Sequence, residues 1–378
     1  MEFDFDIQKN DGYIPSPLEY ECSKLTSGSF GCIFKYEDEE ENSVIEKRFL
    51  ETKNDLYKNG GTVFISFVKE IFIQNLLNKY LNQSITTTIL GYEFMMEYKK
   101  NKSIIEKYSF YSNCIDNDLR DISGNDTVKQ NFIEITRKIL NILNKIHNLD
   151  IVHLDLKPGN FLVTDDLDIF LIDFGLSRIC NSTFNCKKNC HQQLFTQPYR
   201  SCNNIKYIQK FRCNKECSHN VDLKREDLFA VGPMLYELWE GVDEYFVDIP
   251  ENGKERKSHY NYFKKGKWMK KYGDFVDNVI HYFKEHNMYN ENEINNFRKL
   301  LFALVDEEKY QKEVFKLYSY EIMDIGMSIF NSDELKLIEL LKLDDLSQRE
   351  FSKLYKDREV YSYEVLQGFL NFTPSNDT

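Results

Sequence analysis

The sequence predicts an α+β fold in two lobes: a small antiparallel β lobe with one helix, followed by a larger, mainly α-helical lobe. Residues 20–98 hold several short apolar runs of strand length around one helical stretch. Beyond them the apolar residues recur at helical spacing, and this pattern continues from Arg225 nearly to the end of the chain. The predicted divisions are an N-terminal extension at 1–19, the small lobe at 20–98, the large lobe at 99–310, and a C-terminal helical segment with a short polar tail at 311–378.

The composition excludes several classes of protein. The 378 residues are 42% hydrophobic and 29% charged, which is enough apolar material for a core and argues against a disordered chain. Only 16 glycines and 7 prolines are present, which excludes collagen-like and linker-like sequences. The net charge of −12 disfavours a protein that coats nucleic acid, although it leaves room for a local basic patch.

The sequence also predicts a compartment. It contains no run of about 20 apolar residues, so no membrane-spanning helix is expected. The acidic start at Met1–Asp11 lacks the basic and apolar pattern of a secretory signal. We therefore expect a cytoplasmic or otherwise intracellular protein in a reducing compartment, where its nine cysteines are not disulfides. Two interpretations stay open, thiols or a structural zinc site, for Cys186, Cys190, Cys213 and Cys217.

The elements of the small lobe follow from local patterns. Two short strands are predicted within residues 20–36, on either side of a turn of small residues. A third strand is predicted over Ser43–Phe49. Phe67–Leu81 has helical character, with Glu70 in its first turns, and another apolar strand lies within Thr87–Tyr98. The lobe is therefore mostly strand.

The large lobe is predicted to begin with an amphipathic helix. Two short apolar strands follow this helix, at Phe161–Val163 and Ile169–Ile172, and a cysteine-rich loop occupies roughly 180–220. The helix is predicted from apolar residues that recur every three or four positions, namely Phe132, Ile135, Ile139, Ile142 and Ile146.

Polar residues lie before the first of these strands and directly after the second. This polar cluster consists of the segment His153–Asn160 and of Asp173, which opens the triplet Asp-Phe-Gly. Asn160 and Asp173 offer the oxygen ligands that Mg²⁺ prefers. Asp155 is then left to orient a hydroxyl nucleophile, and Lys157 to offset charge on a transferred phosphoryl group.

This cluster resembles the catalytic loop and metal-binding triplet of the eukaryotic-type serine/threonine protein kinases, H-x-D-L-K-x-x-N followed by D-F-G. The resemblance implies the bilobal protein kinase-like fold and the transfer of the ATP γ-phosphate to a protein hydroxyl, with Mg²⁺. It implies Asp155, Lys157 and Asn160 as catalytic residues. It implies Asn160 and Asp173 as metal ligands.

Upstream features support the resemblance. Residues 27–33, Ser-Gly-Ser-Phe-Gly-Cys-Ile, look like the glycine-rich loop that covers the ATP phosphates, with Thr26 in place of its first glycine. Lys47 resembles the lysine that pairs with those phosphates, and Glu70 resembles its ion-pair partner. Strand alternation favours Lys47 over its neighbour Arg48.

Two further segments bear on the nucleotide site. Met96, Glu97 and Tyr98 look like the gatekeeper and linker strand that binds adenine. Gln74, one turn after Glu70, departs from the family because an apolar packing residue is commoner there. The resemblance implies nucleotide binding by Thr26, Ser27, Gly28, Ser29, Phe30, Gly31, Ile33, Lys47, Glu70, Met96, Glu97, Tyr98 and Asp173.

Downstream residues refine the resemblance. Asp227 is expected to brace the backbone of the catalytic loop, and Thr196 is in the substrate-facing loop. The segment Tyr199–Asn203 and the helix start at Arg225–Gly232 are similar to those of the casein kinase I group. The resemblance therefore implies substrates phosphorylated on serine or threonine.

Alternatives remain open at this point. The same residues could belong to a pseudokinase that scaffolds partners, or to a phosphotransferase that acts on small molecules. The basic stretch Lys254–Lys271 is a docking patch or a solvated helix face. We expect ATP and a protein substrate as partners, and neither a membrane nor nucleic acid.

Overall fold

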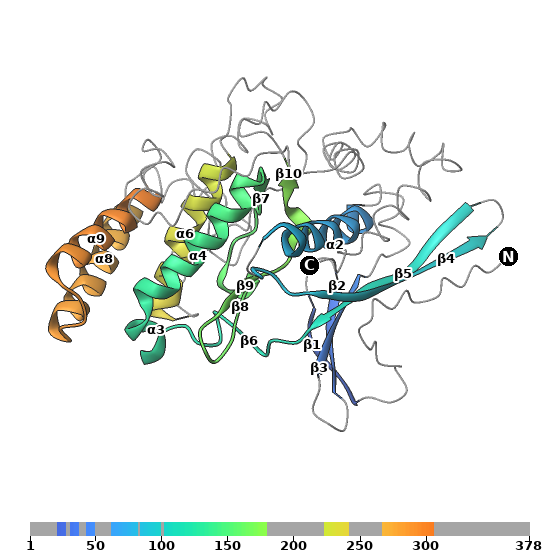
Figure 1. Cartoon of the computed structure of the whole chain (residues 1–378), viewed down its shortest axis with the longest axis horizontal. Coiled ribbons are helices and arrows are strands. Elements are labelled where there is room, and N and C mark those ends of the chain that lie inside the picture. The colour runs from blue at the N-terminus through green and yellow to red at the C-terminus, as the bar shows by residue number, and fades with distance from the viewer. Residues whose placement is uncertain are drawn as a thin grey trace, which may run out of the picture. The chain divides into compact units, whose positions relative to one another are not determined.

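In the computed structural model, the described residues are 21–27, 31–37, 43–49, 62–81, 84–99, 102–179, 223–241 and 267–305. They belong to two compact units (Figure 1). Of the described residues, the first unit contains those up to Asp116 together with Phe170–Gly175. The second unit contains Asn117–Ile169 and those from Leu176 onward.

The first unit is an antiparallel five-stranded sheet with one helix, α2 (Thr62–Tyr80). The strand order is β1-β2-β3-β5-β4. The helix lies against β3, β4 and β5, and its Phe67 ring meets Phe49 of the sheet edge to face, with 5.3 Å between centroids. The strands are β1 (Glu21–Ser27), β2 (Gly31–Glu37), β3 (Ser43–Phe49), β4 (Ile89–Lys99) and β5 (Lys102–Asn113).

The expected elements of this unit are present, with one shift. The strands predicted within residues 20–36 form β1 and β2, and β3 has the predicted bounds. Helix α2 begins at Thr62, ahead of the predicted start at Phe67. Glu70 consequently lies more than two turns inside the helix rather than in its first turns.

The expected boundary between the lobes near residues 98 to 102 needs correction. These positions lie in a hairpin, because Lys99 of β4 pairs with Lys102 of β5. The chain stays in the first unit as far as Asp116. The polar stretch that resembles a linker in the sequence is thus followed by another strand of the same sheet. The strand-forming aromatic residues of β5 come only at its later positions, such as Tyr108 and Phe110.

The second unit is mainly helical. From Asn117 onward the chain also forms two small sheets, with the orders β6-β8-β9 and β10-β7, and the turns η1 and η2. The residues Phe170–Gly175, which include the end of β9 and the start of η2, belong to the first unit. The elements from residue 117 onward are β6 (Asn117–Asp118), α3 (Asp126–Gln130), α4 (Phe132–Asn148), β7 (Ile151–Val152), η1 (Pro158–Asn160), β8 (Phe161–Val163), β9 (Ile169–Leu171), η2 (Phe174–Leu176), β10 (Arg178–Ile179), α6 (Leu223–Glu240), α8 (Lys267–Glu285) and α9 (Glu291–Val305).

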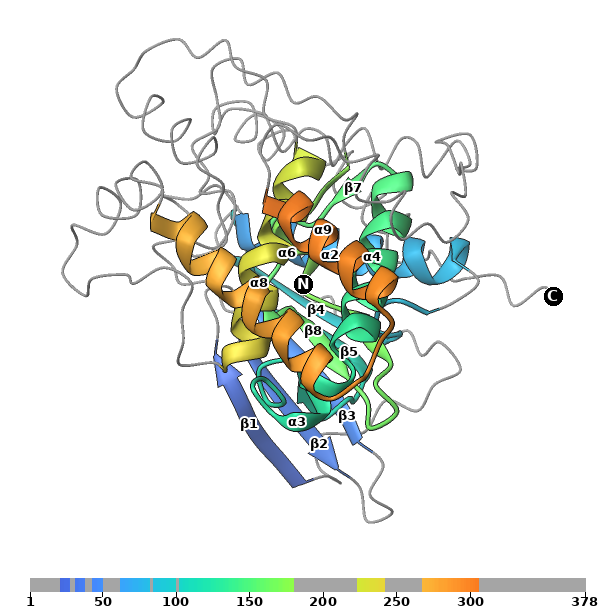
Figure 2. The ribbon, with the colours of Figure 1, turned by 90° about the vertical axis from the view of Figure 1, so that its left-hand side faces the viewer.

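The core of the second unit forms where its long helices meet. Helix α9 lies along α6 and α8, and α6 also contacts α4 (Figures 1 and 2). Phe132 of α4 packs edge to face on Trp239 of α6 and on Phe297 of α9, with centroid distances of 4.9 and 5.9 Å. The amphipathic helix predicted from Phe132 to Ile146 is confirmed, since every apolar residue that predicted it is buried.

The two units confirm the predicted fold class, an antiparallel sheet with one helix and a mainly helical part. No helix in the described ranges is long and apolar enough to cross a membrane. Several expectations lie outside the described residues, namely the cysteine-rich loop, the segment 254–266 of the basic stretch, and the termini at 1–19 and 311–378.

Candidate active site

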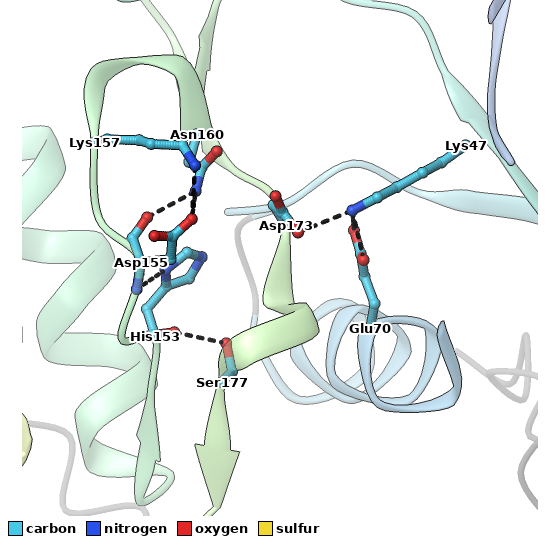
Figure 3. A network of polar contacts seen from close by, with 8 residues as sticks. All are labelled: Lys47, Glu70, His153, Asp155, Lys157, Asn160, Asp173 and Ser177. Atoms are coloured by element: carbon cyan, nitrogen blue, oxygen red, sulfur yellow. Dashed lines mark hydrogen bonds and ion pairs between the residues drawn. The ribbon is translucent and has the colours of Figure 1, made fainter. Parts of the chain in front are cut away.

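The first unit brings three charged residues of the predicted site together. The Lys47 Nζ atom lies 2.8 and 2.7 Å from the two carboxylate oxygens of Glu70, and 2.9 Å from Oδ1 of Asp173 (Figure 3). Lys47 comes from β3, Glu70 from α2, and Asp173 from the turn that follows β9. Two carboxylates from segments far apart in the sequence therefore contact the same ammonium group.

Strand alternation decides which cation of β3 enters this cluster. Side chains of neighbouring residues in a strand point to opposite faces of the sheet. Arg48 instead binds Glu46, with its Nε and Nη2 at 2.9 and 2.7 Å from the carboxylate, and Tyr36 donates to the same carboxylate at 2.6 Å. Burial would raise the pKa of Glu46, but these hydrogen bonds outweigh it and lower the pKa. Lys47 is left as the cation that meets Glu70.

Burial and charge set the protonation of the cluster. Burial favours the neutral amine, but the charges of Asp173 and Glu70 outweigh it and raise the pKa of Lys47, so this residue stays an ammonium. Burial raises the pKa of Glu70 to about 7 against the opposing charge of Lys47. The side chain of Glu70 is only 2% exposed, whereas that of Asp173 is 30% exposed. Asp173 is therefore the carboxylate of this cluster that an incoming ion can reach.

The second unit holds the predicted catalytic loop. Asp155 accepts a hydrogen bond from Lys157 Nζ at 2.7 Å and another from Asn160 Nδ2 at 3.2 Å (Figure 3). The same amide donates to the Asp155 backbone carbonyl at 2.7 Å. His153 takes part through its backbone oxygen, which accepts from Ser177 at 3.2 Å. The loop thus holds one ammonium and one amide within hydrogen-bonding distance of the same carboxylate.

Asp227 of α6 anchors the backbone of this loop. Its carboxylate accepts the backbone N–H groups of His153 and Leu154 at 2.7 and 2.8 Å, and it lies 3.0 Å from Nε2 of His147. Leu154 has a φ of +67°, a left-handed conformation that costs about 1 kcal/mol or more for such a residue. The buried bonds to Asp227 offset that cost, which matches the bracing role expected from the sequence.

We expect Asp227→Ala to lower the free energy of unfolding by about 3 kcal/mol, because two backbone N–H groups lose their acceptor in a fully buried place. Urea denaturation of the purified chain measures this change. Asp166→Ala is the matched control, since Asp166 is an exposed acid of the same unit. A loss as small as that of the control would show that Asp227 does not brace the loop.

The residues of the predicted glycine-rich loop are only partly described. Thr26 and Ser27 end β1, while Gly31 and Ile33 belong to β2, and Gly28, Ser29 and Phe30 lie outside the described residues. Ile33 pairs with Thr26 on one side and with Lys47 on the other. A Cβ atom at Gly31 would collide with the Arg48 carbonyl oxygen, so only glycine fits there.

The structure does not place the predicted linker strand at the end of the first unit. Met96, Glu97 and Tyr98 lie in β4, the edge strand, where they pair with β5. The chain leaves the unit after Asn113, over the residues up to Asp116. A second run of aromatic residues after Tyr98 was the signal for β5 in the sequence. The predicted Thr196 lies outside the described residues.

Comparisons with known proteins agree with this geometry. The family model for the protein kinase domain matches residues 20–328. The chain is 27% identical over 240 residues to the serine/threonine-protein kinase ste20 of Emericella nidulans, which covers 62% of this chain and 24% of the relative. It is 29% identical over 151 residues to mitogen-activated protein kinase kinase 7 of Arabidopsis thaliana, covering 40% of this chain and 44% of the relative.

A shorter match reaches a higher identity. The chain is 32% identical over 114 residues to the phosphorylase b kinase gamma catalytic chain, liver/testis isoform, of Bos taurus, covering 30% of this chain and 25% of the relative. The chain spans less than half the length of each of these curated relatives.

Proposed function

Because the chain belongs to the protein kinase domain family, we propose that it is a serine/threonine protein kinase that transfers the γ-phosphate of Mg·ATP to a protein hydroxyl. The observation that carries this proposal is the position of Lys47, which contacts Glu70 and Asp173 at once. An amine fixed between two carboxylates in this way suits the binding of phosphate oxygens. A scaffold protein has no need of such a costly buried arrangement.

The donor chemistry of the chain fits a magnesium ion. Asp173 offers a carboxylate that is 30% exposed. Asn160 uses its Nδ2 atom for two bonds to Asp155, which leaves its amide oxygen as the group that can serve as a ligand. Mg²⁺ prefers such oxygen ligands, and in phosphoryl transfer it neutralises negative charge on the phosphates. We therefore propose Asn160 and Asp173 as the residues that hold the metal.

The chain's own residues then act by positioning and by charge. Glu70 orients Lys47, which binds phosphate oxygens of the nucleotide. Asp155 accepts a hydrogen bond from the substrate hydroxyl and so aligns it for attack, and Lys157 offsets charge on the transferred group. No covalent intermediate on the protein is required. We propose nucleotide contacts also for Thr26–Gly31 and Ile33 beside Lys47.

The acceptor class is the finer part of the proposal. Lys157 in the catalytic loop and the similarity to the serine/threonine-protein kinase ste20 of Emericella nidulans support serine or threonine as the acceptor. The casein kinase I-like character of Tyr199–Asn203 and Arg225–Gly232 belongs to the same proposal and is supported by the residue pattern alone. An intracellular, reducing location is likewise part of the proposal.

Competition between acceptors tests the proposal. The chain is incubated with Mg²⁺ and ATP labelled in the γ-phosphate, in the presence of serine, threonine and tyrosine peptides and of small alcohols. We expect label on phosphoserine or phosphothreonine, and none when EDTA removes the metal. Label on small alcohols alone would favour a small-molecule phosphotransferase. The absence of label on every acceptor would favour a scaffold.

A further inference from the structure

Helix α2 carries a polar stripe on the face that bears Glu70. Glu70, Gln74 and Asn78 are four residues apart, so they lie on the same side of the helix. Glu70 and Gln74 are each only 1% exposed. A buried glutamine needs hydrogen-bond partners in the protein to offset the hydrogen bonds to water that it loses. The position of those partners therefore constrains the position of the helix.

The partner of this stripe is the segment Ser84–Thr88, which precedes β4. The Oε1 atom of Gln74 accepts a hydrogen bond from the Thr87 hydroxyl at 3.2 Å, in a buried place. Asn78 donates from Nδ2 to the Thr87 carbonyl at 3.1 Å, and it accepts from the Ser84 hydroxyl at 3.2 Å. Three hydrogen bonds therefore join one face of α2 to a segment of five residues.

The same segment also contacts the strand that leads to Asp173. The backbone N–H of Leu171, shortly before Asp173 in the chain, donates to the Ile85 carbonyl at 2.8 Å. The Thr88 N–H donates to Oδ1 of Asn113, at the end of β5, at 2.7 Å. The segment Ser84–Thr88 thus contacts the helix that carries Glu70 and the strand that leads to Asp173.

We propose that Gln74 and Thr87 are positioning residues for phosphoryl transfer, because their buried hydrogen bond holds α2 in the rotation that places Glu70 on Lys47. This inference rests on the proposed function. Apolar packing is not directional, so it would tolerate a small rotation of the helix. A hydrogen bond weakens steeply away from its preferred distance and angle. A slip of α2 by one residue would turn Glu70 by about 100° and break its contact with Lys47.

The expected effect falls on turnover rather than on substrate binding. Without the hydrogen bond between Gln74 and Thr87, α2 samples rotations in which Lys47 still contacts Asp173 but no longer contacts Glu70. Molecules in those rotations bind the acceptor peptide and transfer phosphate slowly. The kcat for transfer should fall while the KM for the acceptor peptide stays the same.

Two neighbouring threonines provide a matched test. Thr86 and Thr87 are both buried, at 1% and 4% exposure, but the Thr86 hydroxyl has no hydrogen-bond partner within the part of the chain that the structure describes. Thr87→Val should lower kcat by up to about tenfold, because the loss of one buried hydrogen bond shifts the ratio between the two rotations of α2 about tenfold. Thr86→Val should leave kcat unchanged, and Thr87→Ser, which keeps the hydroxyl, should retain most of the activity.

The double variant Gln74→Leu/Thr87→Val tests the pair as a unit. In Thr87→Val the buried Oε1 atom of Gln74 loses its hydrogen-bond donor. Replacing Gln74 by leucine as well removes this oxygen. Thermal unfolding and kcat are measured for each single variant and for the double variant, at a temperature well below unfolding. We expect the double variant to recover the unfolding temperature relative to Thr87→Val, while kcat stays low, because apolar packing does not fix the rotation of α2. A lower unfolding temperature with unchanged kcat in both single variants would show a structural role only and would overturn the inference.

A readout independent of activity separates this inference from the proposed function. The ¹⁵N resonance of the Lys47 ammonium, assigned by its absence in Lys47→Arg, reports the contact with Glu70. If the wild-type chain labels no acceptor, the proposed function fails, and the resonance still decides the inference. A change of this resonance in Thr87→Val but not in Thr86→Val supports the role of the pair. The same resonance in all three proteins overturns it.

Discussion

Asp155→Asn is expected to lower kcat for phosphate transfer by about 10³-fold, with little change in the KM for ATP. The carboxylate is buried and is oriented by Lys157 and Asn160, so the amide that replaces it occupies the same place. An amide is a much poorer acceptor for the proton of the substrate hydroxyl. Steady-state kinetics with a serine peptide and Mg·ATP measure the change.

The control for this prediction is Asp166→Asn. Asp166 is an exposed carboxylate of the same unit and has no part in the proposed site. It should retain wild-type kcat. If Asp155→Asn were as active as Asp166→Asn, Asp155 would not be the residue that aligns the acceptor.

Lys47→Met is expected to have the second large effect, on both activity and stability. The kcat should fall about 100-fold or more, because the ammonium group that donates hydrogen bonds to the ATP phosphates is removed. The free energy of unfolding should fall by about 3 kcal/mol at about pH 8, because Glu70 is left buried without its ammonium. The loss should be smaller at about pH 6. The charge of Lys47 lowers the pKa of Glu70, so its removal raises this pKa further above the wild-type value. The folded variant then keeps the proton at pH values where the wild type has lost it, and the variant loses more stability as pH rises through that range.

The double variant Lys47→Met/Glu70→Gln separates the two effects. A neutral amide at position 70 removes the buried charge, so urea denaturation should give a free energy of unfolding closer to that of the wild type. Activity should stay as low as in Lys47→Met. Recovery of turnover in the double variant would contradict the role of Lys47 as the phosphate donor.

Much of this arrangement could be predicted from local sequence. The helix from Phe132 to Ile146 has a strong apolar period, and β3 alternates so that Lys47 and Arg48 face opposite sides of the sheet. The catalytic loop is a contiguous segment, so its polar residues are visible together. Glu70 was also predictable, because it is the one acidic residue of α2.

Other features depend on contacts that the sequence does not display. The end of the first unit was misplaced because Lys99 and Lys102 resemble a linker, whereas they pair across a hairpin. Gln74 stood out only as an unusual polar residue. The role of Gln74 depends on its hydrogen bond with Thr87, which the chain brings back to α2 in the segment before β4. Such tertiary partners have no local periodicity from which to predict them.

The position of the label transferred from ATP tests the central claim most directly. The wild-type chain is incubated with Mg²⁺ and a protein acceptor, in parallel with ATP labelled in the γ-phosphate and ATP labelled in the α-phosphate. We predict that serine or threonine of the acceptor gains the γ-label and not the α-label. Transfer of the α-label, or no transfer of either by a chain that binds Mg·ATP, would contradict the account.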